Sequence, residues 1–225
     1  MYSFRPLPTT ELLDLIGGDF VNQFQQQMDL VIDPLRKHIA LGRPLSLGKE
    51  LWEYAVADSI PGAEWNGAGH SIIDVKIGND IGIDVKGVSK QVRSKNTTEA
   101  SMFQNFDQNA KSYFIAGDAQ GVWDIHVKGW LSKIAEVKNY YILGIIREKE
   151  TTDCSLCGFK ITPPDKLEYK QELVEFSQSS IKILGLVDPD FASIKYYNSK
   201  SRIEIVFKPQ CWTNPEYALP IYKFS

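Results

Sequence analysis

The stretch IIDVKIGNDIGIDVKG, residues 72–87, contains the triplet Asp-Val-Lys twice, ten residues apart. On both sides of Gly78-Asn79-Asp80, β-branched apolar residues hold the odd positions, and aspartate and lysine occupy even ones. Because neighbouring side chains of a strand point to opposite faces, this alternation predicts a β-hairpin with one core face and one polar face. The expected core face consists of Ile73, Val75, Ile77, Ile81, Ile83 and Val85.

The register of this hairpin decides which polar residues meet. A three-residue loop, Gly78-Asn79-Asp80, pairs Ile77 with Ile81 and places Asp74 opposite Asp84, whereas a four-residue loop would shift the pairing. Like charges that face each other across two strands destabilise a sheet, so a cation is needed to offset them. Lys86 projects from the same face, and a divalent cation would serve equally.

Two carboxylates beside an ammonium group suit phosphate chemistry. Mg²⁺ in proteins commonly takes one or two carboxylates, keeps several waters and accepts phosphate oxygens. It lowers the pKa of a bound water and stabilises charge on the phosphate. A neighbouring lysine can orient or deprotonate the attacking water, or stabilise the transition state. We therefore expect Asp74, Asp84 and Lys86 to be catalytic, without separating the roles of the lysine.

An acid on one strand followed by Asp-x-Lys on the next resembles the PD-(D/E)xK nuclease superfamily, which includes most type II restriction endonucleases. Asp74 matches the first acid, although Ile73 replaces the usual preceding proline, and Asp84-Val85-Lys86 matches the second element. The resemblance implies an α/β or α+β fold with a restriction-endonuclease-like core, a mixed central β-sheet flanked by helices. It also implies Asp74, Asp84 and Val85 as metal ligands, and Mg²⁺-dependent DNA cleavage that leaves 5′-phosphates.

Members of the superfamily often carry a helical glutamate near the metal. The segment 46–60 is predicted to be a helix that ends at Pro61-Gly62, and it contains Glu50 and Glu53. On a helical wheel the apolar stripe contains Leu47, Leu51, Tyr54 and Ala55, and Glu50 borders it, whereas Glu53 lies nearly opposite. The wheel therefore favours Glu50 as an additional catalytic acid.

Two alternatives to this site remain open. In one, Asp74-Val75-Lys76 is the Asp-x-Lys element and Glu64 is the earlier acid, although Glu64 lies in a glycine-rich stretch that predicts a loop. In the other, the polar face is simply solvated, as in many antiparallel sheets. The basic stretch after Lys86 contains Lys90, Arg93 and Lys95, which we expect to contact DNA phosphates or bases.

The bulk properties suit one domain of 225 residues. We divide it into a mostly helical part (1–60) that offers a dimerisation element, a catalytic core (61–147) and a β-rich C-terminal part (148–225). The net charge of −3 argues against non-specific coating of nucleic acid. The sequence shows neither a membrane span nor a signal peptide, and its odd number of cysteines indicates a reducing cytoplasm.

Further elements follow from local patterns. We expect a helix from Thr97 or Thr98 with a stripe at Met102, Phe103 and Phe106. Buried strands are expected at 112–117 and 139–146, and a hairpin around Asn198-Ser199. Cys154 and Cys157 resemble half of a zinc site, for which only Cys211 and three scattered histidines could supply the rest.

The sequence thus predicts a Mg²⁺-dependent endonuclease that acts on double-stranded DNA, most like a type II restriction enzyme. Recognition of a palindrome would favour a homodimer. Two other functions remain possible: a structure-selective repair or Holliday-junction nuclease of the same fold, and a non-catalytic DNA-binding domain.

Overall fold

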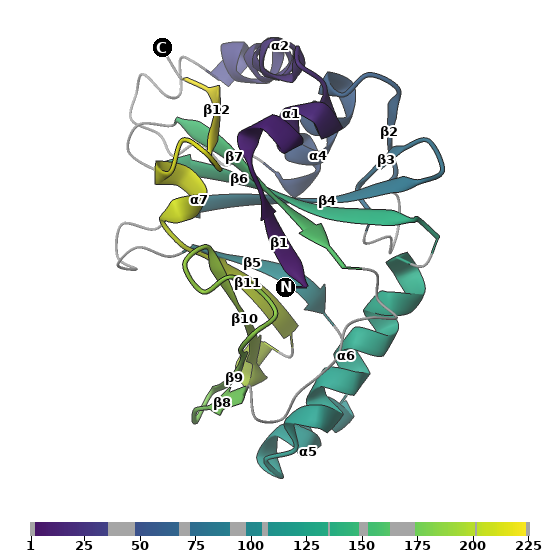
Figure 1. Cartoon of the computed structure of the whole chain (residues 1–225), viewed down its shortest axis with the longest axis vertical. Helices are drawn as coiled ribbons and strands as arrows, with labels where there is room; N and C mark the ends of the chain where they lie inside the picture. Colours follow the sequence, from purple (N-terminus) through teal and green to yellow (C-terminus); the bar gives the residue numbers. More distant parts are fainter. Residues whose placement is uncertain are drawn as a thin grey trace.

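A mixed seven-stranded sheet forms the centre of the protein, and a second, five-stranded sheet packs below it in the computed structural model (Figure 1). The prediction of an α+β fold with a mixed central sheet flanked by helices is confirmed. The structure describes residues 3–35, 48–67, 73–90, 98–104, 108–134, 136–148, 153–162, 174–200 and 202–223.

The central sheet runs in the order β1-β7-β6-β4-β3-β2, and β12 pairs with β7 beyond the end of β1. Only β4 and β6 run parallel among its described strands, and this parallel pair makes the sheet mixed. The bounds are β1 (Phe4–Leu7), β2 (Ala63–Trp65), β3 (Val75–Ile77), β4 (Ile81–Lys90), β6 (Asn139–Glu148), β7 (Cys154–Ile161) and β12 (Leu219–Tyr222).

The chain between β4 and β6 leaves the central sheet and contributes one strand and two helices to the layer that contains the second sheet. Its strand β5 joins the second sheet, which is antiparallel in the order β5-β11-β10-β9-β8, and the helices α5 and α6 follow β5. These elements are β5 (Thr98–Gln104), α5 (Gln108–Ile115), α6 (Ala119–Ile134), β8 (Val174–Phe176), β9 (Ser180–Ile183), β10 (Ala192–Tyr197) and β11 (Arg202–Phe207).

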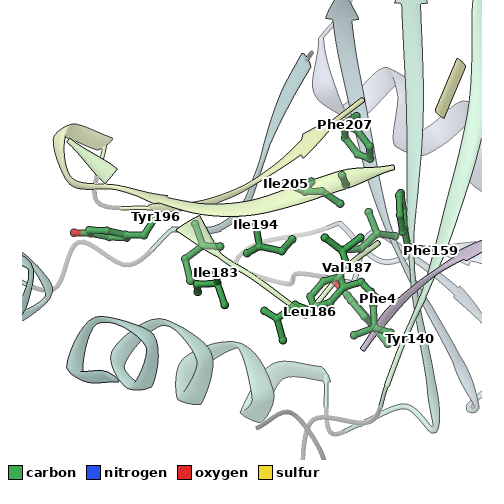
Figure 2. Packing of buried hydrophobic residues seen from close by; sticks show 14 of the residues in the cluster. Phe4, Tyr140, Phe159, Ile183, Leu186, Val187, Ile194, Tyr196, Ile205 and Phe207 are labelled. Atoms are coloured by element: carbon green, nitrogen blue, oxygen red, sulfur yellow. The ribbon is translucent and has the colours of Figure 1, made fainter. Parts of the chain in front are cut away.

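Two apolar clusters hold the layers together, one on each face of the central sheet. On one face, Val85 and Leu143 pack with the helices α1 (Thr9–Ile16), α2 (Phe20–Ile32) and α4 (Lys49–Ser59). We call this the helix-side cluster. On the other face, Ile142 packs with α6 and the inner face of the second sheet. Figure 2 shows this second cluster, the sheet-side cluster, in which Phe159 and Phe207 meet.

The prediction of a mostly helical N-terminal part is confirmed for its described residues, and so is the end of the 46–60 helix before Pro61. Helix α1 ends at Ile16 because Gly17 adopts a φ of +93°, which favours glycine. Helix α2 ends at Ile32, before a 3₁₀ turn that contains Pro34, and α4 ends at Ser59, before Pro61. None of the helices in the described part combines the length and apolar character that a bilayer span requires.

Two predictions between residues 97 and 117 are wrong. Residues 98–104 form strand β5 instead of a helix, because β11 offers them a hydrogen-bonding edge that no local pattern reveals. Residues 112–115, expected as a buried strand, end helix α5, where Tyr113 and Ile115 are exposed. The strand at 139–146 and the C-terminal hairpin, β10 and β11 around Asn198, are confirmed.

Candidate active site

The hairpin forms with the predicted three-residue loop. Strand β3 pairs with β4 through Ile77–Ile81, Lys76–Gly82 and Val75–Ile83. Gly78 adopts a φ of +57°, a conformation that suits glycine at the start of the loop. The register that the sequence predicts is therefore confirmed up to Val75.

Beyond Val75 the ladder is interrupted at Asp74. The N–H of Asp74 donates to the carbonyl of Ile83 at 2.9 Å, so Asp74 and Val75 both face Ile83, as in a β-bulge. The Asp74 carboxylate then takes the place of a main-chain acceptor, because the Val85 N–H donates to its Oδ2 at 2.8 Å. The predicted direct Asp74–Asp84 pair is therefore wrong. The Asp74 carboxylate instead binds the main chain of β4 at Val85, the residue next to Asp84.

The bulge also changes which face each residue occupies. Val75, Ile83 and Val85 join the helix-side cluster, whereas Ile73 lies in the sheet-side cluster, so the prediction of one common apolar face is wrong for Ile73. Gly82 makes room for it, since an added Cβ would lie 3.0 Å from Ile73 Cδ1.

The side chains of Asp74 and Asp84 are both buried, with Asp74 2 % and Asp84 1 % exposed. The alternative of a solvated polar face is therefore wrong at these two residues. Burial of a carboxylate costs free energy because the charge loses its hydration, so buried carboxylates are commonly paired or functional.

Asp84 uses its two oxygens differently. Oδ2 accepts a hydrogen bond from the Tyr140 hydroxyl at 3.2 Å, and Oδ1 forms an ion pair with Lys86 Nζ. Apart from this ion pair, no hydrogen bond to Oδ1 is present in the described part of the chain. The Lys86 side chain is 10 % exposed, so the fork opens toward solvent at its ammonium group. We define the acidic fork as Asp74, Asp84 and Lys86.

Glu53, and not Glu50, is the buried acid of α4. Glu53 is 2 % exposed, whereas Glu50 is exposed on the first turn of the helix. Trp65 Nε1 donates to Glu53 Oε2 at 3.3 Å, and the next residue, Asn66, donates its N–H to the carbonyl of Asp74 at 2.7 Å. Trp65 at the end of β2 and Asn66 after it therefore connect Glu53 to the main chain of Asp74, and the choice of Glu50 is not supported by the geometry.

The helical wheel failed because α4 is covered on more than one side. Trp52 and Val56 are buried in the helix-side cluster, whereas Tyr54, expected in the apolar stripe, is exposed. Trp52 lies against Gly87 of β4, where an added Cβ would come within 2.4 Å of its ring. Glu53 is covered by the segment after β2, since a Cβ on Gly67 would lie 2.6 Å from its Oε2.

The alternative set of Glu64, Asp74 and Lys76 is less well assembled. Glu64 lies in strand β2, contrary to the predicted loop, and pairs in register with Lys76, but its side chain is exposed. The Lys76 ammonium forms an ion pair with Glu136 at 2.9 Å. Of the two lysines, Lys86 is thus the one that pairs with a buried aspartate, Asp84.

The expected DNA contacts fall largely outside the described part. Lys90 is the last residue of β4, and its side chain is not among those described. Arg93 and Lys95 lie outside the described residues altogether. Their role in DNA binding stays a prediction.

The cysteines do not form half of a zinc site. Cys154 and Cys157 lie on opposite faces of β7, in different apolar clusters. Burial raises the pKa of Cys154 to about 12. A hydrogen bond with Cys211 and burial raise the pKa of Cys157. Burial thus favours the thiol over the thiolate form of both cysteines in the metal-free protein.

The acidic fork supplies two carboxylates as candidate ligands. In the described part no group of three or more His, Cys, Asp or Glu side chains is placed to hold a metal. Glu53 therefore does not join Asp74 and Asp84 as a direct ligand in this geometry. One or two carboxylates with several waters is nevertheless a common Mg²⁺ arrangement, so the fork suits this ion.

Tyr140 was not anticipated from the sequence. The run NYYILGII predicts a buried strand correctly, but only the parallel pairing of β6 with β4 brings the Tyr140 hydroxyl to Asp84. Comparison with known proteins adds nothing to this geometry, since no family model, curated protein or solved structure matches the chain.

Proposed function

We propose that this protein is a Mg²⁺-dependent endonuclease that hydrolyses phosphodiester bonds of double-stranded DNA and leaves 5′-phosphates, in the manner of a type II restriction enzyme. The observation that carries the proposal is the acidic fork: two buried aspartates, Asp74 directly before β3 and Asp84 in β4, with the ammonium of Lys86 paired to Asp84. A hairpin with only a structural role would gain more stability from apolar residues than from buried charges at these positions.

The residues present suit a small divalent cation. Asp84 Oδ1 is buried and forms an ion pair with the Lys86 ammonium. Asp74 is fixed beside it through the Val85 N–H, and the Val85 carbonyl is the main-chain oxygen of the same residue. These three residues would hold Mg²⁺, which when bound supplies an acidified water and offsets charge on the phosphate.

The side chains of the fork have separate tasks in this proposal. Asp74 is held rigidly, because its carboxylate bonds to the main chain of the strand that carries Asp84. Lys86 is the most exposed member of the fork and so faces an incoming phosphate. Its ammonium stabilises negative charge that develops on the phosphate, or it orients or deprotonates the attacking water.

The proposal extends to partners and cellular place. The basic segment with Lys90, Arg93 and Lys95 follows β4 directly, so it leaves the strand that carries Asp84 and Lys86. It would contact phosphates or base edges of DNA in the cytoplasm. A palindromic recognition site would be read by a homodimer, since two-fold symmetry in the DNA is matched by two subunits.

Incubation of the purified protein with plasmid DNA and Mg²⁺ tests the proposal. The wild type is expected to yield discrete fragments, and Lys86→Ala is expected to bind DNA but not to cut it. Lys76→Ala is the matched control, because this lysine belongs to the same hairpin but pairs with Glu136. Cleavage by Lys86→Ala together with an inactive Lys76→Ala would move the site to the alternative set.

A further inference from the structure

Tyr140 is the residue through which β6 contacts the acidic fork. It is the second residue of β6, is buried, and pairs in register with Gly82, two residues before Asp84. Its hydroxyl donates to Asp84 Oδ2 at 3.2 Å. A neutral donor thus reaches a buried carboxylate from the neighbouring parallel strand.

The surroundings of Tyr140 keep its ring in one place. Tyr140 belongs to the sheet-side cluster, with Phe4 and Phe159 (Figure 2). Beside it, Ile73 and Val137 pack over Gly82, where an added Cβ would lie 3.0 Å from each of them. A ring held in a close-packed interior presents its hydroxyl in a fixed direction.

This hydrogen bond makes the two oxygens of Asp84 inequivalent. The torsion that rotates an aspartate carboxylate is broad, so without a partner the oxygens exchange positions readily. With Oδ2 bound by Tyr140, Oδ1 is the oxygen left for a cation, and the Lys86 ammonium contacts that atom. The hydrogen bond therefore selects both the orientation of the carboxylate and the oxygen that it offers.

We infer that Tyr140 is a positioning residue of the metal site, which holds the Asp84 carboxylate so that Oδ1 faces the bound cation. This inference rests on the proposed function. Tyr140 does not touch the metal or the phosphate, and it acts only through Asp84. Partners of metal ligands typically change metal affinity by about 10- to 100-fold when they are removed.

The test measures Mg²⁺ binding to the DNA-free protein by isothermal titration calorimetry, so that no turnover is involved. Tyr140→Phe is expected to weaken Mg²⁺ binding by about 10-fold or more. The matched control is Tyr141→Phe, since Tyr141 is the adjacent buried residue of β6 but lies in the helix-side cluster. This control is expected to bind Mg²⁺ as the wild type does.

Cleavage kinetics separate positioning from a merely structural role. For Tyr140→Phe the Mg²⁺ concentration at half-maximal rate is expected to rise with the dissociation constant, while the rate at saturating Mg²⁺ approaches that of the wild type. 4-Aminophenylalanine in place of Tyr140 keeps an N–H donor at the end of the ring and is expected to restore affinity. Melting curves of all variants establish that they are folded, and the 4-aminophenylalanine protein provides the comparison if Tyr140→Phe does not fold.

The outcomes distinguish this inference from the proposed function. If the wild type binds Mg²⁺ and cuts DNA but Tyr140→Phe binds as tightly, the positioning role is overturned and the nuclease stands. Equal weakening in Tyr140→Phe and Tyr141→Phe, or no rescue by 4-aminophenylalanine, likewise overturns it. If the wild type neither binds Mg²⁺ nor cuts DNA, both are overturned.

Discussion

Two buried carboxylates, Asp84 in the central sheet and Glu204 in the second sheet, have similar surroundings but different charge balance. Each pairs with a basic residue two positions away on its own strand, Asp84 with Lys86 and Glu204 with Arg202. Glu204 is 0 % exposed, and its Oε1 accepts from both Arg202 and Lys200, the latter at 3.0 Å.

The two groups differ in the sum of their formal charges. The formal charges of Asp74, Asp84 and Lys86 sum to −1, and a divalent cation would bring this group to a positive charge. Glu204, Lys200 and Arg202 already sum to +1. Burial of a charge alone therefore does not indicate a cation site. Of the two groups as defined by their three residues, only the acidic fork carries a formal excess of negative charge, which a cation can offset.

The largest expected effect separates activity from stability in the acidic fork. Asp74→Asn keeps an oxygen that accepts from the Val85 N–H but removes the charge. Since a bound metal contributes several kcal/mol to transition-state stabilisation, the cleavage rate is expected to fall by about 10³-fold or more. The free energy of unfolding is expected to stay within about 1 kcal/mol of the wild type. A time course with a DNA duplex and a urea titration measure the two quantities.

A large loss of stability in Asp74→Asn, parallel to its loss of activity, would contradict this separation. It would make Asp74 a structural residue, like the carboxylate with which it is compared.

The opposite result is expected for the second sheet. Glu204→Gln weakens charge-assisted hydrogen bonds from Arg202 and Lys200, so the free energy of unfolding is expected to fall by about 1–3 kcal/mol. The cleavage rate per folded molecule is expected to remain that of the wild type, because Glu204, Lys200 and Arg202 already carry a net positive formal charge. The same urea titration and time course apply, and loss of cleavage in a folded Glu204→Gln protein would refute the contrast.

The smallest expected effect concerns the helix that covers the sheet. Glu53 is buried and is connected to Asp74 through Trp65 and Asn66, so Glu53→Gln is expected to lower the cleavage rate by about 10-fold. Glu50→Gln, on the same helix but exposed, serves as control and is expected to leave the rate unchanged. Equal cleavage rates in Glu53→Gln and Glu50→Gln would show that Glu53 of α4 does not contribute to the site.

The hairpin was predictable because its information is local. Alternation of apolar and charged residues, together with one short loop, determined strands and register from Ile77–Ile81 to Val75–Ile83. The bulge at Asp74 was not predictable, because it depends on a side chain that replaces a main-chain acceptor for Val85. A side chain that replaces a main-chain acceptor in this way does not alter the alternation of apolar and polar residues, so the sequence pattern does not reveal it.

The errors elsewhere come from contacts between distant segments. Strand β5 forms because β11, about a hundred residues later in the chain, offers it an edge. Glu53 is buried because the segment after β2 covers a side of α4 that the wheel assigned to solvent. Tyr140 reaches Asp84 only because β6 lies parallel to β4. All three depend on tertiary pairing, which overrides local preference.

Nuclease activity of the acidic fork is tested most directly by incubation of plasmid DNA with the protein and Mg²⁺, with Asp74→Asn purified in parallel to exclude a contaminating nuclease. The wild type is expected to yield discrete fragments, whose ends a DNA ligase joins without prior kinase treatment because they carry 5′-phosphates. The Asp74→Asn protein should leave the plasmid intact. A plasmid left intact by the wild type with both Mg²⁺ and Mn²⁺, or cut equally by the two proteins, would contradict the assignment of the acidic fork as a nuclease site.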